Sequence, residues 1–245
     1  MRYWRAYGFV FDHPKWAMNL LCGAVCMLIP VAGHMVYMGW LFEVIEGFHR
    51  RGTEKYPPFE FGRFTHYLMR GLWPFVVLLI LSLAAIPLVL LLMAVFVIVM
   101  VSSQGKPHWL TLTLVIVGGI VAGLFLNVLL MLVKTPMVLR AGFTQELKGA
   151  FAWATTIDFI KKMWLELLFA GFFLVFTSIP IILLGELCCL IGVYPASALV
   201  LMAEHHLLFQ LYELYLKRGG IAIPLKPEAP VSPPPVSDAE EAEPV

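Results

Sequence analysis

The chain has 245 residues, of which 60% are apolar and only 13% are charged, and its formal net charge is +1. A soluble globular domain has about 45–50% apolar and about 25% charged residues, so this composition excludes an ordinary soluble domain. A net charge near zero creates no overall field that attracts nucleic acid, and we expect no nucleic-acid partner.

Long apolar segments divide the chain. In order they are 16–29, 31–48, 72–101, 110–133 and 164–211, the last interrupted over 185–192 by a carboxylate and two glycines. The segments 72–101 and 110–133 contain no charged residue. Both exceed the roughly 20 residues that cross a hydrocarbon core about 30 Å thick. The sequence therefore predicts an all-α, polytopic transmembrane helical bundle.

Isoleucine–proline pairs occur in three apolar segments, each of which begins after a basic residue. Pro30, Pro87 and Pro180 follow the basic residues Lys15, Arg70 and Lys162 by 15, 17 and 18 residues. At 1.5 Å per residue this separation is about 22–27 Å, close to the far edge of the hydrocarbon core. Because proline ends or bends a helix, we expect each of the three to form a turn or kink near one membrane face.

In three places an apolar segment ends in basic residues followed by glycine, at 49–52, 139–142 and 217–220. We interpret these segments as the second helices of hairpins, which run back to the membrane face where the first helices begin. Cations and glycine both favour a helix C-terminus. We therefore predict three hairpins, about six membrane helices, that begin and end at one basic surface.

The distribution of lysine and arginine favours six spans over five. Cytoplasmic flanks collect basic residues, and six spans place every basic residue except Lys106 on one side, sixteen against one. Five spans, with Pro30 as a kink, give thirteen against four. Six spans make Pro30 a turn and place both termini in the cytoplasm, as in a bacterial inner-membrane protein. The segment 16–29 has only 14 residues, so a re-entrant segment is an alternative there.

Three regions follow from this pattern. Residues 1–12 form an N-terminal cytoplasmic segment, 13–220 a single transmembrane domain, and 221–245 a tail with seven prolines and five acidic residues. Such a tail cannot form a core and is expected to be disordered. Its proline run is either featureless or a docking segment for a polyproline-binding partner.

An amphipathic helix is expected between the second and third hairpins. Phe143, Leu147 and Phe151 recur every four residues, which places an apolar stripe on one face of a helix over 140–164. With Lys161, Lys162 and Trp164 beside it, this helix is predicted to lie in the cytoplasmic headgroup region.

Ionisable residues in the last apolar segment are the leading site candidates. Glu204, His205 and His206 are followed by Gln210, and ionisable groups within a membrane are costly and usually functional. His206 and Gln210 lie one helical turn apart, whereas Glu204 and His205 point about 100° apart and need not share a face. The alternative is that these groups meet water where the helix leaves the membrane.

Small residues in 110–133 indicate close helix contact. Gly119 and Gly123 form a Gly-x-x-x-Gly pattern, for which packing within the monomer is favoured over dimerisation. Asn127, in the same segment, is expected to make a hydrogen bond between helices.

Catalytic signatures are absent from the sequence. It contains no phosphate-binding glycine loop, no His-Glu-x-x-His and no Gly-x-Ser-x-Gly. We therefore expect no enzyme, no catalytic residue, no cofactor and no metal. Cys22 and Cys26, one helical turn apart, are interpreted as buried thiols in preference to a metal site or a disulfide.

The first third of the chain resembles the domain-of-unknown-function family 4013, a group of prokaryotic integral membrane proteins. The matching pattern is Pro-x-Trp at 14–16, Ile-Pro-x-x-Gly at 29–33, Gly-aromatic at 39–40, a basic helix end at 50–52 and a proline-containing link at 57–59. The late stretch 189–219 is also similar to the family, and the resemblance covers roughly 10–220 without the tail. It implies a membrane protein and no known activity.

Two functions fit these observations. The first is a non-enzymatic accessory or scaffolding component of the membrane, with the lipid bilayer around it and either a membrane-protein partner or a homo-oligomer as its assembly. The alternative is a small-molecule or ion transporter, or a channel-like protein, that uses Glu204, His205 and His206, because prolines within helices and internal repeats mark many transporters.

Overall fold

A computed structural model describes residues 1–52, 55–102, 109–188 and 191–226. None of these residues forms a β-strand. The elements are α1 (Arg5–Phe11), α2 (Trp16–Leu28), α3 (Ala32–Arg51), the 3₁₀ helix η1 (Phe61–Arg63), α4 (Phe64–Ser102), α5 (Trp109–Thr144), α6 (Leu147–Ala150), α7 (Trp153–Leu187) and α8 (Val193–Lys217). The predicted all-α class is confirmed.

Three helices among the described residues are long and apolar enough to cross a membrane, namely α4, α5 and α7. The helix α2 is also apolar but has only 13 residues. A chain with three such helices is an integral membrane protein.

The three prolines take both of the predicted positions, one at a turn and two within helices. Pro30 lies between the end of α2 and the start of α3, next to Val31 with its positive φ of 62°. Pro87 and Pro180 instead lie inside α4 and α7, which continue beyond them. A turn at these two positions is therefore excluded, and a bend within the helix stays the prediction, because a helix exposed to lipid that stopped there would leave further backbone groups unpaired.

The predicted continuous helix over 140–164 is wrong. Gln145, with a φ of 53°, ends α5, and its N–H donates to the carbonyl of Ala141 at 3.0 Å. A single short turn, α6, then precedes α7. The apolar stripe is used differently from the prediction: Phe143 is fully buried and Phe151 packs against the same core, so the stripe faces the protein interior.

Both ends of the described chain pack on the helical core. In α1, Phe9 and Val10 are buried, and the hydroxyl of Tyr56 donates to the carbonyl of Val10 at 2.7 Å. Burial raises the pKa of Tyr56 to about 12, so this donor keeps its proton at neutral pH.

The start of the predicted tail is ordered on the fold. The N–H of Ile223 donates to the hydroxyl of Tyr212 at 2.9 Å, and the N–H of Lys226 donates to the carbonyl of Phe143 at 3.1 Å. Residues 221–226 therefore differ from the predicted disorder. The rest of the tail, 227–245, lies outside the described residues.

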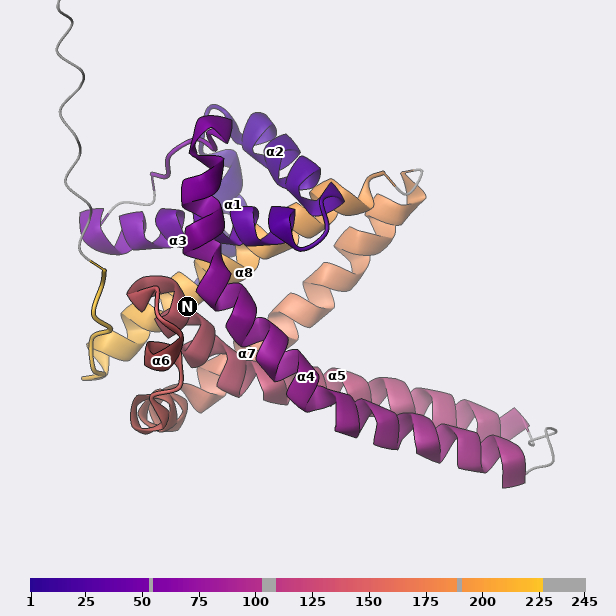
Figure 1. The fold of residues 1–245 in the computed structure, drawn as a ribbon. Helices are drawn as coiled ribbons and strands as arrows, with labels where there is room; N and C mark the ends of the chain where they lie inside the picture. Colours follow the sequence, from indigo (N-terminus) through magenta and orange to yellow (C-terminus); the bar gives the residue numbers. More distant parts are fainter. Residues whose placement is uncertain (53–54, 103–108, 189–190, 227–245) are drawn as a thin grey trace, which may run out of the picture.

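The outer parts of α4 and α5 form an arm that projects from the rest of the molecule (Figure 1). From residue 80 to its end, α4 extends about 33 Å, which matches the thickness of a hydrocarbon core. Large apolar side chains such as Leu90, Ile98 and Ile120 are exposed along this arm. Such a surface is suited to lipid or to another membrane helix.

The helices α3 and α4 cross at two glycines. A Cβ atom on Gly39 would lie 1.9 Å from the carbonyl oxygen of Tyr67, and one on Gly71 would lie 1.8 Å from the carbonyl oxygen of Met35. Each of these positions is also under 3 Å from the backbone nitrogen of the other glycine. The two backbones therefore touch, and no larger residue fits at this crossing.

We predict that Gly71→Ala lowers the free energy of unfolding by about 1–3 kcal/mol, because its methyl group overlaps backbone atoms that cannot move aside. Thermal unfolding of the purified protein in detergent measures the change. The matched control is Gly119→Ala, where a Cβ meets nothing within 4 Å. The control is expected to be neutral or to gain up to about 1 kcal/mol in helix propensity. Equal stability of both variants would contradict the tight crossing.

Candidate functional site

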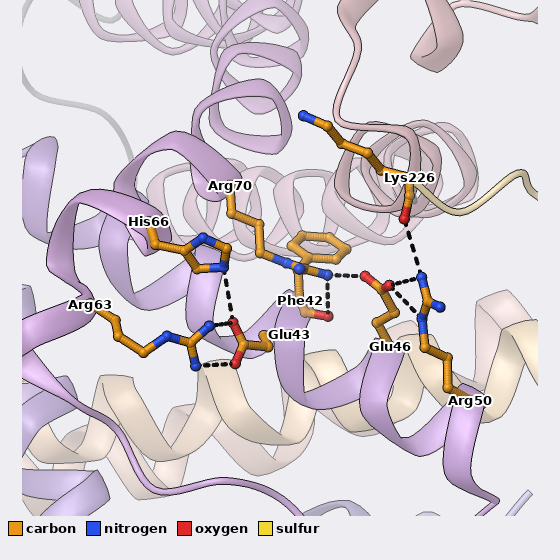
Figure 2. Close-up of polar contacts among 8 residues, drawn as sticks. All are labelled: Phe42, Glu43, Glu46, Arg50, Arg63, His66, Arg70 and Lys226. Atoms are coloured by element: carbon orange, nitrogen blue, oxygen red, sulfur yellow. Dashed lines mark hydrogen bonds and ion pairs between the residues drawn. The ribbon is translucent and has the colours of Figure 1, made fainter. Parts of the chain in front are cut away.

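Ion pairs surround two carboxylates of α3 near its crossing with α4 (Figure 2). Arg63 binds Glu43 with two nitrogens, at 2.7 Å and 2.9 Å, and Nε2 of His66 lies 3.2 Å from the same carboxylate. Because every charge in this group has a partner, we assign the group a structural role.

Glu46 is the buried member of this group, with 8% of its surface exposed. Nε of Arg50, one helical turn further along α3, donates to it at 2.8 Å. Arg70 of α4, which is equally buried, pairs with the other carboxylate oxygen. Sequence reasoning placed Arg70 at the membrane surface, and the structure instead places it inside the contact between α3 and α4.

A second ion pair joins α5 to α8, inside the apolar part of the fold. Nζ of Lys134 donates to Oε1 of Glu204 at 2.6 Å, and both side chains are partly buried. Sequence reasoning singled out Glu204 and missed Lys134, because a lysine after an apolar run resembles an ordinary membrane flank. Lys134 and Glu204 lie 70 residues apart in the chain, and no local sequence pattern indicates that they meet.

His205, next to this pair, is 4% exposed. Its Nδ1 lies 2.9 Å from the carbonyl oxygen of Leu201, and because a carbonyl only accepts, Nδ1 carries the proton. In the neutral ring Nε2 is then an acceptor, and it has no hydrogen-bond partner in the part of the chain that the structure describes. The buried Oγ1 of Thr135 likewise has no partner there.

Two adjoining cavities reach these groups. The larger, of about 420 Å³, lies between α4 and α5 and is lined by His34, Phe75, Leu78, Leu79, Leu81, Ser82, Asn127, Leu130, Met131 and Lys134. The smaller, of about 60 Å³, is bordered by Thr135, Glu204 and His205. His34, Leu78 and Lys134 line both cavities. His34, from the first turn of α3, was not among the predicted site residues, and the structure brings it to the site.

His206 and Gln210 contact the N-terminal segment of the chain instead of the cavities. The ring of His206 stacks on Phe9 of α1 at 4.4 Å between centroids, and its Nδ1 accepts a hydrogen bond from Nε2 of Gln210 at 3.0 Å. Gln210 also bonds both backbone groups of Arg2, at 2.8 Å and 3.1 Å. The predicted cluster is therefore divided: Glu204 and His205 line the smaller cavity, whereas His206 and Gln210 hold the N-terminal segment.

The small residues of α5 are not packed as predicted. A Cβ atom on Gly119 or Gly123 would meet nothing within 4 Å, so this face makes no close contact with the rest of the described chain. Asn127 is exposed and lines the larger cavity, and it makes no hydrogen bond to another helix within the described residues. The predicted packing inside the monomer is replaced by an open face.

Thiols and acidic groups do not assemble a metal centre in the described ranges. No group of three His, Cys, Asp or Glu side chains lies close enough there to hold a metal ion. Cys22 and Cys26 are free and buried, whereas Cys188 is free and exposed. The cavities thus offer hydrogen-bonding groups and one ion pair as their chemistry.

We predict that Lys134 and Glu204 are strongly coupled. Lys134→Met or Glu204→Gln alone leaves one charge unpaired and should lower the free energy of unfolding by about 2–4 kcal/mol, whereas the double variant should lose less than the sum of the two. Thermal unfolding of the wild type, the two single variants and the double variant gives the coupling energy of the pair in a double-mutant cycle. Lys161→Met, on the surface of α7, is the charge-matched control and should change little. Additive losses would show that the two groups do not interact.

Comparisons with known proteins identify one relationship. A family model described as a protein of unknown function (DUF4013) matches residues 22–190, which is more than half of the chain. No curated protein and no solved structure matches the chain. The matched range contains His34 and Lys134, whereas Glu204 and His205 lie beyond it. The chain belongs to the DUF4013 family, as its sequence resemblance indicated.

Proposed function

We propose that the protein is a non-enzymatic accessory or scaffolding component of the cell membrane, and that it holds another membrane helix against the arm of α4 and α5. The observation that carries this proposal is the open small-residue face of α5, at Gly119 and Gly123, on an arm that projects from the fold (Figure 1).

Small residues matter here because of how helices associate in lipid. Apolar side chains gain nothing by leaving lipid for another helix, so association depends on close backbone approach and on hydrogen bonds. Gly119, Gly123 and Asn127 are spaced four residues apart and share one side of α5. The glycines permit close approach and the unpaired amide offers a hydrogen bond to a partner. A second copy of this chain or a different membrane protein satisfies both requirements.

A topology with six membrane segments in three hairpins and both termini in the cytoplasm is the second part of the proposal. Basic residues end α3, at His49, Arg50 and Arg51, and Lys217 ends α8. The turn at Pro30 supports the first hairpin. The positive-inside rule then places these helix ends in the cytoplasm of a bacterial inner membrane.

We predict that labelling from outside intact cells distinguishes this topology. An impermeant maleimide should label Cys188, in a Cys189→Ser background, without permeabilisation. A cysteine introduced by Lys217→Cys, in a background where Cys188 and Cys189 are serine, should react only after permeabilisation. The buried Cys22 and Cys26 serve as the internal background in both proteins. Labelling of both positions from outside would show that α8 does not cross the membrane.

We predict a fixed stoichiometric complex, with a second copy or another membrane protein, in native mass spectrometry of protein released gently from its own membrane. Gly119→Leu with Gly123→Leu should abolish the complex, because the two side chains fill the open face. Val121→Leu, an exposed apolar position of the same helix, is the control that should preserve it. A lone wild-type monomer would contradict the accessory role.

Transport of a small molecule or ion is a second candidate function, favoured by the cavities beside Lys134 and Glu204. A monomer that retains a small ligand in the same measurement would support this candidate. The contributing residues would then be Glu204 and His205, since His206 contacts α1 instead.

A further inference from the structure

We propose that the adjoining cavities between α4, α5 and α8 form a binding site for an uncharged, hydroxyl-bearing amphiphile, such as a neutral glycerolipid with a single chain. Its hydroxyl head would lie beside His205 and Thr135, and its hydrocarbon chain would lie in the larger cavity. This inference does not depend on the proposed accessory role, because Gly119 and Gly123 do not line the cavities, although Asn127 borders both the larger cavity and the proposed partner face.

The larger cavity has the size and walls of a small-molecule site. Its volume of about 420 Å³ falls within the range of about 300–1,000 Å³ that such sites have. Apolar side chains from two helices form most of its wall: Phe75, Leu78, Leu79 and Leu81 of α4, with Leu130 and Met131 of α5. Both helices carry the exposed apolar surface that faces lipid, so a hydrocarbon chain enters from the membrane.

The smaller cavity supplies a polar end at which two buried groups lack a hydrogen-bond partner among the described residues. Nε2 of His205 is a buried acceptor, and the hydroxyl of Thr135 can donate or accept, yet neither has a partner in the described residues. Buried polar groups in proteins are almost always paired with protein, water or ligand. A hydroxyl group satisfies both, since it donates to the imidazole and also accepts from the threonine.

The charge of the site selects an uncharged head. Lys134 and Glu204 lie 2.6 Å apart and neutralise each other, so they leave no counter-charge for a protonated His34 or His205, and with both imidazoles neutral the site carries no net charge. An anionic or cationic head would bring a charge without a counter-charge into a site of low dielectric constant, which is costly. Water molecules alone fit the small cavity, but they leave the apolar walls of the larger one without an occupant.

Binding of 1-oleoylglycerol to the purified full-length protein in detergent tests this inference. Titration followed by native mass spectrometry measures the number of bound molecules and the affinity. Oleate, oleylamine and methyl oleate share the chain and differ in the head. We expect one saturable 1-oleoylglycerol per protein, bound about tenfold more tightly than each of the other three, since each lacks either the neutral charge or the hydroxyl donor.

Two variants locate the bound molecule. Thr135→Val keeps the shape and removes the hydroxyl, and His205→Phe removes the acceptor; each should weaken 1-oleoylglycerol binding about tenfold. Thr113→Val, elsewhere on α5, is the matched control and should bind as the wild type does. Thermal unfolding of each variant confirms that it is folded. If His205→Phe does not fold, the isosteric Thr135→Val alone tests whether the amphiphile binds at this site.

Three results would overturn the inference. Tighter binding of oleate or oleylamine would show that the site selects a charge. Equal binding of all four amphiphiles, unchanged by Thr135→Val, would show lipid adhering to the outer surface only. Absence of a saturable 1-oleoylglycerol complex would show that water alone occupies the cavity. None of these results bears on whether a complex forms at Gly119 and Gly123, so the two proposals fail separately.

Discussion

The contact between Gly39 and Gly71 is the constraint on which the arrangement of the other helices depends. Because neither residue has a side chain, the backbones of α3 and α4 approach so closely that a Cβ atom on either glycine would lie under 3 Å from the other's nitrogen. This approach carries Arg70 to Glu46, and the arginine also donates to the carbonyl of Phe42 at 3.4 Å (Figure 2). The crossing also directs the rest of α4, and with it α5, away from the other helices as the arm (Figure 1).

The buried ion pair adds specificity to this crossing more than it adds stability. Removing two charges from water costs several kcal/mol per ion, and the attraction between Glu46 and Arg70 is needed to offset that cost. Any other register of α3 against α4 would separate the pair and leave both charges buried. The glycines therefore permit a close contact, and the charges restrict it to one register. His34, at the start of α3, is thereby placed beside Phe75 and Leu78 of α4, where the larger cavity begins.

The sequence predicted the helices more accurately than their contacts. Helix positions follow from apolar runs and from Pro30, since both depend on local chemistry. Local chemistry left open whether Pro87 and Pro180 end or only bend their helices, and the helices continue because lipid penalises any break in a helix. Glycine spacing also failed to identify the close helix contact. The Gly-x-x-x-Gly pattern at Gly119 lies on an open face, whereas Gly39 and Gly71, which meet at the crossing, lie far apart in sequence and form no pattern.

The candidate site shows the same division between local and long-range information. Glu204 and His205 were identifiable because ionisable groups stand out in an apolar helix. Helix geometry placed His206 one turn from Gln210, and the two are hydrogen-bonded, but it did not predict that Glu204 and His205 line one cavity. Lys134 was not found, because its significance depends on a contact across 70 residues of chain. Sequence alone could not show that this lysine faces a carboxylate instead of water.

The arm and the cavities have opposite character, and this difference separates their proposed roles. The arm presents apolar and small residues outward, so what it contacts must be apolar and closely packed. The cavity presents unpaired polar atoms inward behind apolar walls, so its occupant must be amphiphilic. The cavity walls come from helices inside the family match, whereas Glu204 and His205 come from α8, beyond it. A change confined to α8 would therefore alter the head group that is accepted and leave the arm as it is.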